Sequence, residues 1–89
     1  MLGIAYRPEQ SFQNNVSEVR HDIAKRFGQR VRKARVRRKL SQEALAAKAD
    51  LDRAFLSGIE RGAENPSLFT IQAIADALET RIGNLMRGI

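Results

Sequence analysis

The residues best suited to contact a ligand lie in the stretch 40–67, which reads LSQEALAAKADLDRAFLSGIERGAENPS. The pattern predicts two short helices joined by a tight turn, together spanning about residues 41–61. On the second helix we expect Arg53, Ala54, Ser57 and Gly58 to be exposed. A helix with an apolar side and short polar residues opposite fits the major groove of DNA, where each base pair presents a distinct set of donors and acceptors.

Two residues of this helix have a second interpretation. Arg53 can donate two hydrogen bonds to guanine, but it could instead contact phosphate only. Phe55 could meet a thymine methyl group or simply flank the core. Gly58 lowers helix stability by roughly 0.5–1 kcal/mol relative to Ala, a cost that is easier to explain if the backbone approaches DNA closely.

The composition argues against catalysis and against a metal site. The chain has no cysteine, and His21, on a basic segment, is its only histidine. A solvated His21 is the simpler interpretation, and no Gly-rich phosphate loop follows a strand. We therefore expect no catalytic residue, no metal and no cofactor.

Positive charge is concentrated in one segment. The net charge is +6, and residues 20–39 carry ten Lys or Arg and one Asp, a balance of +9. The basic residues 26, 30, 33 and 37 are expected to share one helix face. Such a stripe attracts nucleic acid, although a solvated face of a basic protein would look the same.

The remaining pattern predicts helices almost throughout. A first helix over 18–38, with Ser17 as N-cap, has Val19, Ile23, Phe27, Val31 and Ala34 on one face. The next two begin at the N-caps Ser41 and Asp52, with the core residues Leu45, Ala46, Ala49, Leu56 and Ile59. Gly62 suits the position after the third helix. Ser67 and Thr80 are expected to cap two more helices. The first has the core face Ile71, Ile74, Ala75 and Leu78, and the second is a short helix that carries Ile82, Leu85 and Met86.

These elements predict a compact, all-α, five-helix domain over residues 17–89. Residues 1–16 show no clear period and are expected to form an N-terminal arm. Their apolar residues Ile4, Tyr6, Phe12 and Val16 suggest that the arm docks on another surface, such as a partner subunit.

The segment from Phe27 to Met86 resembles the helix-turn-helix domain of phage-repressor and Cro-like regulators, the XRE family. The matching residues are Arg35, Leu40-Ser41-Gln42, Leu45-Ala46, Ile59-Glu60-Arg61-Gly62, Asn65-Pro66-Ser67, Ile74-Ala75 and Leu78. The short length and the pattern Arg53…Glu60-Arg61-Gly62 also resemble those of the controller proteins of restriction–modification systems. This family usually has Gly where the chain has Lys39 and Asp50, so both residues are expected at positive φ.

The resemblance implies roles for individual residues. Arg53, Ala54, Ser57 and Gly58 would face base edges, and Lys39, Ser41, Gln42 and Asn65 would contact phosphates. Asn65 could instead cap its loop. Arg35 and Glu60 resemble an internal ion pair of the family, the alternative being two separate surface charges.

The resemblance therefore predicts a homodimeric transcription regulator that binds double-stranded DNA at an inverted repeat. Ile82, Leu85, Met86 and Ile89 offer more apolar surface than a short terminal helix can bury on its own domain, so we expect them at the dimer interface. Two alternatives remain: an antitoxin that binds DNA and a toxin, and a protein-interaction module that binds no DNA. No apolar stretch is long enough to span a membrane, and no signal peptide is visible, so we expect a cytoplasmic protein.

Overall fold

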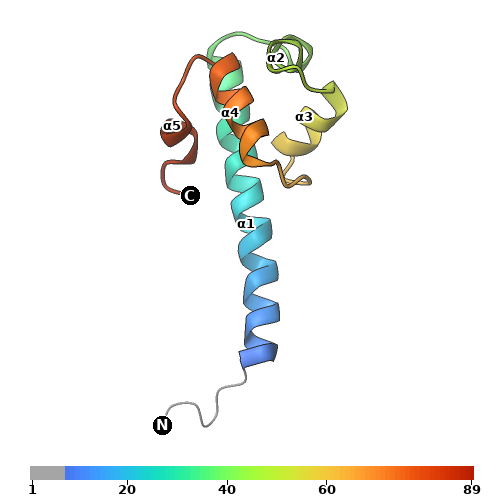
Figure 1. Cartoon of the computed structure of the whole chain (residues 1–89), viewed down its shortest axis with the longest axis vertical. Coiled ribbons are helices and arrows are strands. Elements are labelled where there is room, and N and C mark those ends of the chain that lie inside the picture. The colour runs from blue at the N-terminus through green and yellow to red at the C-terminus, as the bar shows by residue number, and fades with distance from the viewer. Residues whose placement is uncertain (1–7) are drawn as a thin grey trace.

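The computed structural model describes residues 8–89, with side chains from residue 22 onward, and within this range all regular structure is helical (Figure 1). The helices are α1 (Pro8–Arg37), α2 (Gln42–Ala49), α3 (Arg53–Glu60), α4 (Leu68–Ala77) and α5 (Ile82–Met86). The predicted all-α, five-helix fold is confirmed.

α1 begins ten residues before the start expected from the sequence. Its first residue is Pro8, which suits this position because the first N–H groups of a helix have no partner within it. Ser17 therefore lies inside α1 and is not an N-cap. Residues 8–16 of the expected arm are helical, because Phe12 and Val16 extend the helical spacing of α1 through a polar stretch. Residues 1–7, with Ile4 and Tyr6, lie outside the described residues.

The helix starts follow the expected caps in part. Ser41 Oγ accepts a hydrogen bond from the backbone N–H of Ala44 at 3.0 Å, and Ser67 Oγ accepts one from Thr70 at 3.1 Å. Asp52 occupies the N-cap position of α3, but its side chain makes no capping hydrogen bond. Thr80 is not a cap, since α5 begins one residue later than expected and its N-cap is Arg81.

Within residues 8–89, three residues other than glycine adopt positive φ, each where a helix ends. Lys39 and Asp50, with φ of 60° and 56°, are at the expected positions. Glu79, with φ of 56°, was not expected there. Gly is the usual residue at such helix ends, because it adopts positive φ without strain. Each of these three residues therefore carries some backbone strain.

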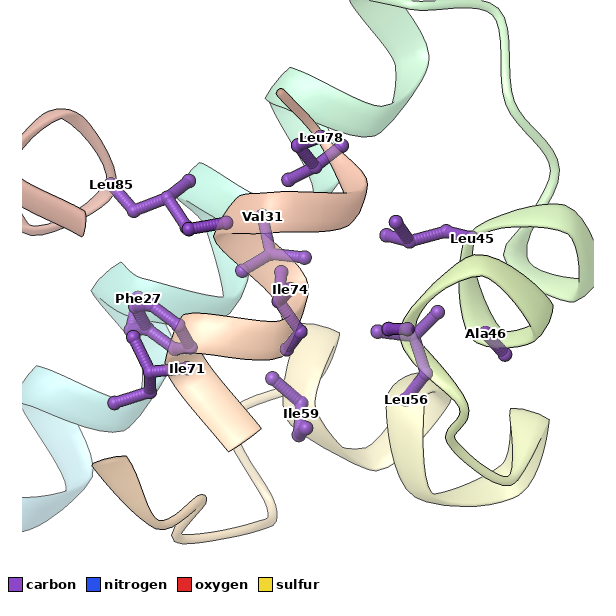
Figure 2. Close-up of a cluster of buried hydrophobic side chains, with 12 residues drawn as sticks. Phe27, Val31, Leu45, Ala46, Leu56, Ile59, Ile71, Ile74, Leu78 and Leu85 are labelled. Carbon is purple, nitrogen blue, oxygen red and sulfur yellow. The ribbon is translucent and has the colours of Figure 1, made fainter. Parts of the chain in front are cut away.

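The core joins all five helices (Figure 2). Its fully buried residues of largest volume are Val31, Leu45, Leu56, Ile59, Ile74 and Leu78. Figure 2 shows Ile74 near the centre of this cluster and Leu85 entering it from α5. The core fixes α3 by one face and leaves its other face in solvent.

A glycine sets the closeness of α1 and α3. A Cβ added at Gly28 would lie 2.3 Å from the carbonyl oxygen of Ile59 and 2.6 Å from that of Glu60. Both obstacles are backbone atoms, which cannot move aside as a flexible side chain can. Gly28 thus lets α1 support the C-terminal end of α3, a role that the sequence pattern did not predict.

Candidate nucleic-acid interface

The turn between α2 and α3 fixes the angle at which α3 leaves the domain. Asp50 adopts the left-handed backbone conformation and turns the chain away from α2. Its N–H donates to the carbonyl oxygens of Ala46 and Ala47 at the end of α2. The N–H of Leu51 donates to the carbonyl of Ala46 at 2.8 Å. Leu56 and Ile59 then hold the inner face of α3, with 0% and 1% of their surface exposed.

The outer face of α3 carries three of the four residues expected to read bases. Arg53 and Ala54 are exposed, and Ser57, one turn later, is half-buried. Gly58 is buried, so the expectation that it is exposed was wrong. A Cβ at Gly58 would lie 2.7 Å from Cγ of Glu64. The side chain of Glu64, in the loop after α3, therefore covers Gly58.

Phe55, the other residue of α3 with two interpretations, is half-buried and packs against the hydrophobic core. This position favours the core role over contact with a thymine methyl group.

Arg35 and Glu60 are brought together as an internal ion pair. Arg35 Nε donates to Glu60 Oε2 at 2.7 Å, and Arg35 Nη2 donates to Glu60 Oε1 at 3.0 Å. The two side chains expose only 12% and 3% of their surface. This two-point geometry is that of a strong charge-assisted pair, and it ties α1 to the last residue of α3.

Two further bonds extend this pair into a buried cluster. Arg35 Nη1 donates to the carbonyl of Leu40 at 2.9 Å, and Gln42 Nε2 donates to Glu60 Oε1 at 3.0 Å. Hydrogen bonding to the Glu60 carboxylate raises the pKa of Arg35 and outweighs the opposing effect of burial. Arg35 therefore stays charged at any physiological pH. The cluster joins α1, the start of α2 and the end of α3.

The place of Gln42 in this cluster was not predicted. Its expected role was a phosphate contact, yet one amide N–H is used inside the molecule. An amide nitrogen has two donors, so the second remains to bond a phosphate. The Gln42–Glu60 bond orients that second donor.

The other residues expected to contact phosphates lie at the surface. Lys39 and Ser41 are exposed just before α2, and Asn65 is exposed in the loop that follows α3. Ser41 Oγ accepts the capping bond from Ala44, and its own O–H remains a donor.

The basic stripe of α1 faces α5 and not α3. Figure 1 shows α5 and α3 on opposite sides of α1. Arg30, Lys33 and Arg37 line one hollow of about 390 Å³ together with residues of α5. The predicted grouping of these three residues is therefore confirmed, but the group does not border the outer face of α3.

Two residues of the stripe bind the C-terminal segment. Arg26 Nη1 donates to the carbonyl of Gly88 at 3.3 Å, and Arg30 Nη1 donates to that of Asn84 at 3.0 Å. Arg30 Nη2 also donates to the carbonyl of Arg87. These arginines bind carbonyls at the end of α5, where cations are favoured by the helix dipole.

The expected interface residues of α5 are not equally accessible. Leu85 is buried in the core of its own domain, with 3% of its surface exposed, so its expected role in a dimer contact was wrong. Ile82, Met86 and Ile89 are half-buried and pack against the edge of the core. The sequence pattern overestimated the free apolar surface because it could not show that Leu85 reaches α1 and α4.

The most exposed large apolar residues from residue 22 onward are Leu68 and Phe69, at the start of α4. Their exposed fractions are 77% and 88%. Neither residue was predicted to be functional, although two successive apolar residues directly after the cap Ser67 were the available signal. Within the described residues, no helix is long and apolar enough to cross a membrane.

The fold and these residues match known proteins. A helix-turn-helix family model matches residues 31–85. The immunity repressor protein of Bacillus phage phi105 is 46% identical over 59 residues, which cover 66% of this chain but only 41% of the repressor. The control protein C.MunI of Mycoplasma sp is 40% identical over 70 residues, covering 78% of this chain and 95% of that protein.

A solved structure agrees with these relatives. The restriction–modification controller protein C.AhdI from Aeromonas hydrophila aligns with a TM-score of 0.69 and 44% identity, covering 72% of this chain and 96% of that one. The chain belongs to the helix-turn-helix family, as a DNA-binding transcription regulator of the phage-repressor and controller type.

Proposed function

We propose that the chain acts as a homodimer that places α3 of each subunit in the major groove of an inverted-repeat site. The observation that carries this proposal is the contrast between the two ends of α3. Glu60 is anchored by Arg35 and Gln42, whereas Arg53 and Ala54 at the other end are exposed. A helix anchored at its C-terminal end can present its first turn to a ligand with little rearrangement on binding.

Base reading falls to Arg53, Ala54 and Ser57. The guanidinium of Arg53 can donate to O6 and N7 of one guanine, a pairing worth ~1–3 kcal/mol of discrimination against the wrong base. The methyl group of Ala54 suits a thymine methyl, and the Ser57 hydroxyl can donate or accept. Gly58 is excluded from this set because it is buried.

Phosphate contacts come from the start of α2 and from the loop after α3. Ser41, the second N–H of Gln42 and the free backbone N–H groups of the first turn of α2 suit one phosphate. Lys39 and Asn65 are exposed and suit neighbouring phosphates. These contacts position the domain but carry no base information.

The dimer follows from the size of the site. One α3 reaches only a few base pairs, so two copies are needed for useful specificity. Dimeric phage repressors bind half-sites about one DNA turn apart, ~34–36 Å, a value that comes from those proteins and not from this chain. We place the contact at the half-buried residues Ile82, Met86 and Ile89 of the C-terminal segment.

Selection from a random DNA pool, followed by titration across salt, tests this function. We expect an inverted repeat to be recovered, and each phosphate contact should contribute a slope of about −0.9 in log K against log salt. Recovery of no motif together with a salt-independent affinity would contradict DNA recognition by this chain.

A second candidate is DNA binding combined with capture of a protein partner, as in an antitoxin. The exposed pair Leu68 and Phe69 favours it, because adjacent large apolar side chains in solvent are typical of protein contact sites. Phe69→Glu separates the two functions. If Phe69→Glu leaves both dimerisation and DNA binding intact while a co-purifying protein is lost, the second candidate holds.

A further inference from the structure

The N-terminal half of α1 extends beyond the rest of the domain. Figure 1 shows it (blue) running past the other four helices. α1 has 30 residues, so it is about 45 Å long at ~1.5 Å per residue. The match to C.AhdI uses 96% of that chain but 72% of this one, and the family model begins at residue 31. This half of α1 therefore lies outside the residues that the family model matches.

The sequence of this half of α1 carries an apolar stripe. Phe12, Val16, Val19 and Ile23 follow one another at spacings of 4, 3 and 4, and the residues between them are polar. On a helix, positions with this spacing share one face. The same alternation of 3 and 4 marks the contact face of paired helices.

The stripe leads into the surface proposed for dimerisation. Ile23, its last residue, is 41% exposed. It lines an open hollow of about 610 Å³ together with the apolar residues Phe27, Ile71 and Met86 and the polar loop residues Glu64 and Asn65. Met86 belongs to the proposed α5 contact, so the stripe and that contact border the same hollow.

The start of α4 adds to this apolar region. Pro66 and Ile71 both line the hollow, and Leu68, between them in the chain, is 77% exposed. A two-fold contact buries the same patch on both subunits, so an apolar region continuous with one dimer contact suits a second copy of the chain. Two short stripes alone would pair only weakly, because isolated helices of this length are marginal in water.

We propose that the N-terminal half of α1 is a second contact element of the homodimer, in which the stripe of Phe12, Val16, Val19 and Ile23 packs against the same stripe of a second copy. This inference rests on the proposed homodimer and extends its interface beyond α5. This half of α1 supplies contact area that the short α5 cannot provide once Leu85 is committed to the core.

Single cysteines test the contact directly, because the chain has none of its own. Val16→Cys and Val19→Cys place a thiol on the stripe, and Gln10→Cys and Asn14→Cys place one on the opposite face as matched controls. Under mild oxidation, at least one stripe variant should form disulfide-linked dimers at least tenfold faster than both controls. Equal rates on the two faces would overturn the inference.

Sedimentation of charged variants separates this inference from the homodimer itself. The double variant Val16→Glu/Val19→Glu should raise the dimer Kd at least tenfold, while the control Gln10→Glu/Asn14→Glu should leave it unchanged. If the wild type dimerises and both double variants match it, the stripe contact is refuted and the α5 contact stands. If the wild type is monomeric at every concentration, the proposed homodimer fails and this inference fails with it. Circular dichroism would confirm that each variant remains helical.

Discussion

The two sides of α1 use the same kind of residue in opposite ways. On the α3 side, Arg35 and Gln42 are half-buried and join the buried Glu60 in a cluster linked by hydrogen bonds. On the α5 side, Arg26 and Arg30 stay in contact with solvent and donate to backbone carbonyls near the end of the chain. One side orients α3, and the other holds down α5.

This difference shows that the number of charges in a segment does not reveal where they act. The +9 balance of residues 20–39 led us to expect a basic stripe that meets DNA. In the structure, Arg30, Lys33 and Arg37 border α5, and Arg38 pairs with Glu79 at 3.4 Å. Lys25 and Arg32 are also exposed, and Arg32 lines a second hollow together with Lys33 and Arg37. The DNA contacts proposed above therefore lie on α2, α3 and the loop after α3, and this group of α1 residues is not among them.

Breaking the buried pair should have the largest effect on stability. Arg35→Ala or Glu60→Ala leaves one charge buried without its partner, which should cost ~3–5 kcal/mol of the free energy of unfolding. Urea denaturation measures this loss. In the double variant Arg35→Met/Glu60→Leu no charge is left unpaired, so it should recover much of the stability. A double variant as unstable as the sum of both single changes would show that the two charges do not depend on each other.

The seam between α1 and α3 should be the next most sensitive feature. Gly28→Ala forces a methyl group against the carbonyls of Ile59 and Glu60 and should cost ~1–3 kcal/mol. Gly58→Ala is the matched control, because its methyl group meets only the movable side chain of Glu64. Its higher helix propensity should offset that contact and leave stability within ~1 kcal/mol of the wild type. Equal losses in the two variants would contradict a backbone-limited approach at Gly28.

The α5 side should respond least. Arg30→Ala removes hydrogen bonds that remain near solvent, so it should cost under ~1 kcal/mol by urea denaturation. Arg26→Ala should have a similarly small effect. A loss as large as that of Arg35→Ala would mean that the two sides of α1 do not differ in the way described.

Much of the fold could be predicted because it depends on local patterns. The apolar spacing identified the core of α2, α3 and α4, and Ser41, Ser67 and Gly62 marked the ends of helices. The left-handed turn at Asp50 followed from resemblance to a family that usually has Gly there. The start of α1 was missed because polar residues between 8 and 16 obscure the spacing of Phe12 and Val16.

The features that were missed depend on contacts between distant residues. The burial of Gly58 depends on where the loop places Glu64, and the role of Gly28 depends on how closely α1 and α3 cross. The bond from Gln42 to Glu60 joins residues 18 apart in the chain. No local pattern encodes these distances, so only the assembled structure gives them.

The most direct test of the account compares one arginine on α3 with one beside α5. Arg53→Ala and Arg81→Ala each remove one exposed positive charge, and affinities would be measured for a selected operator and for random duplex DNA. We expect Arg53→Ala to lower operator affinity roughly tenfold more than random-DNA affinity, the equivalent of ~1.4 kcal/mol for a lost base contact. Arg81→Ala should leave the ratio of the two affinities unchanged. If Arg53→Ala lowers both affinities equally, Arg53 contacts phosphate, and the claim that the exposed face of α3 reads bases through this residue is wrong.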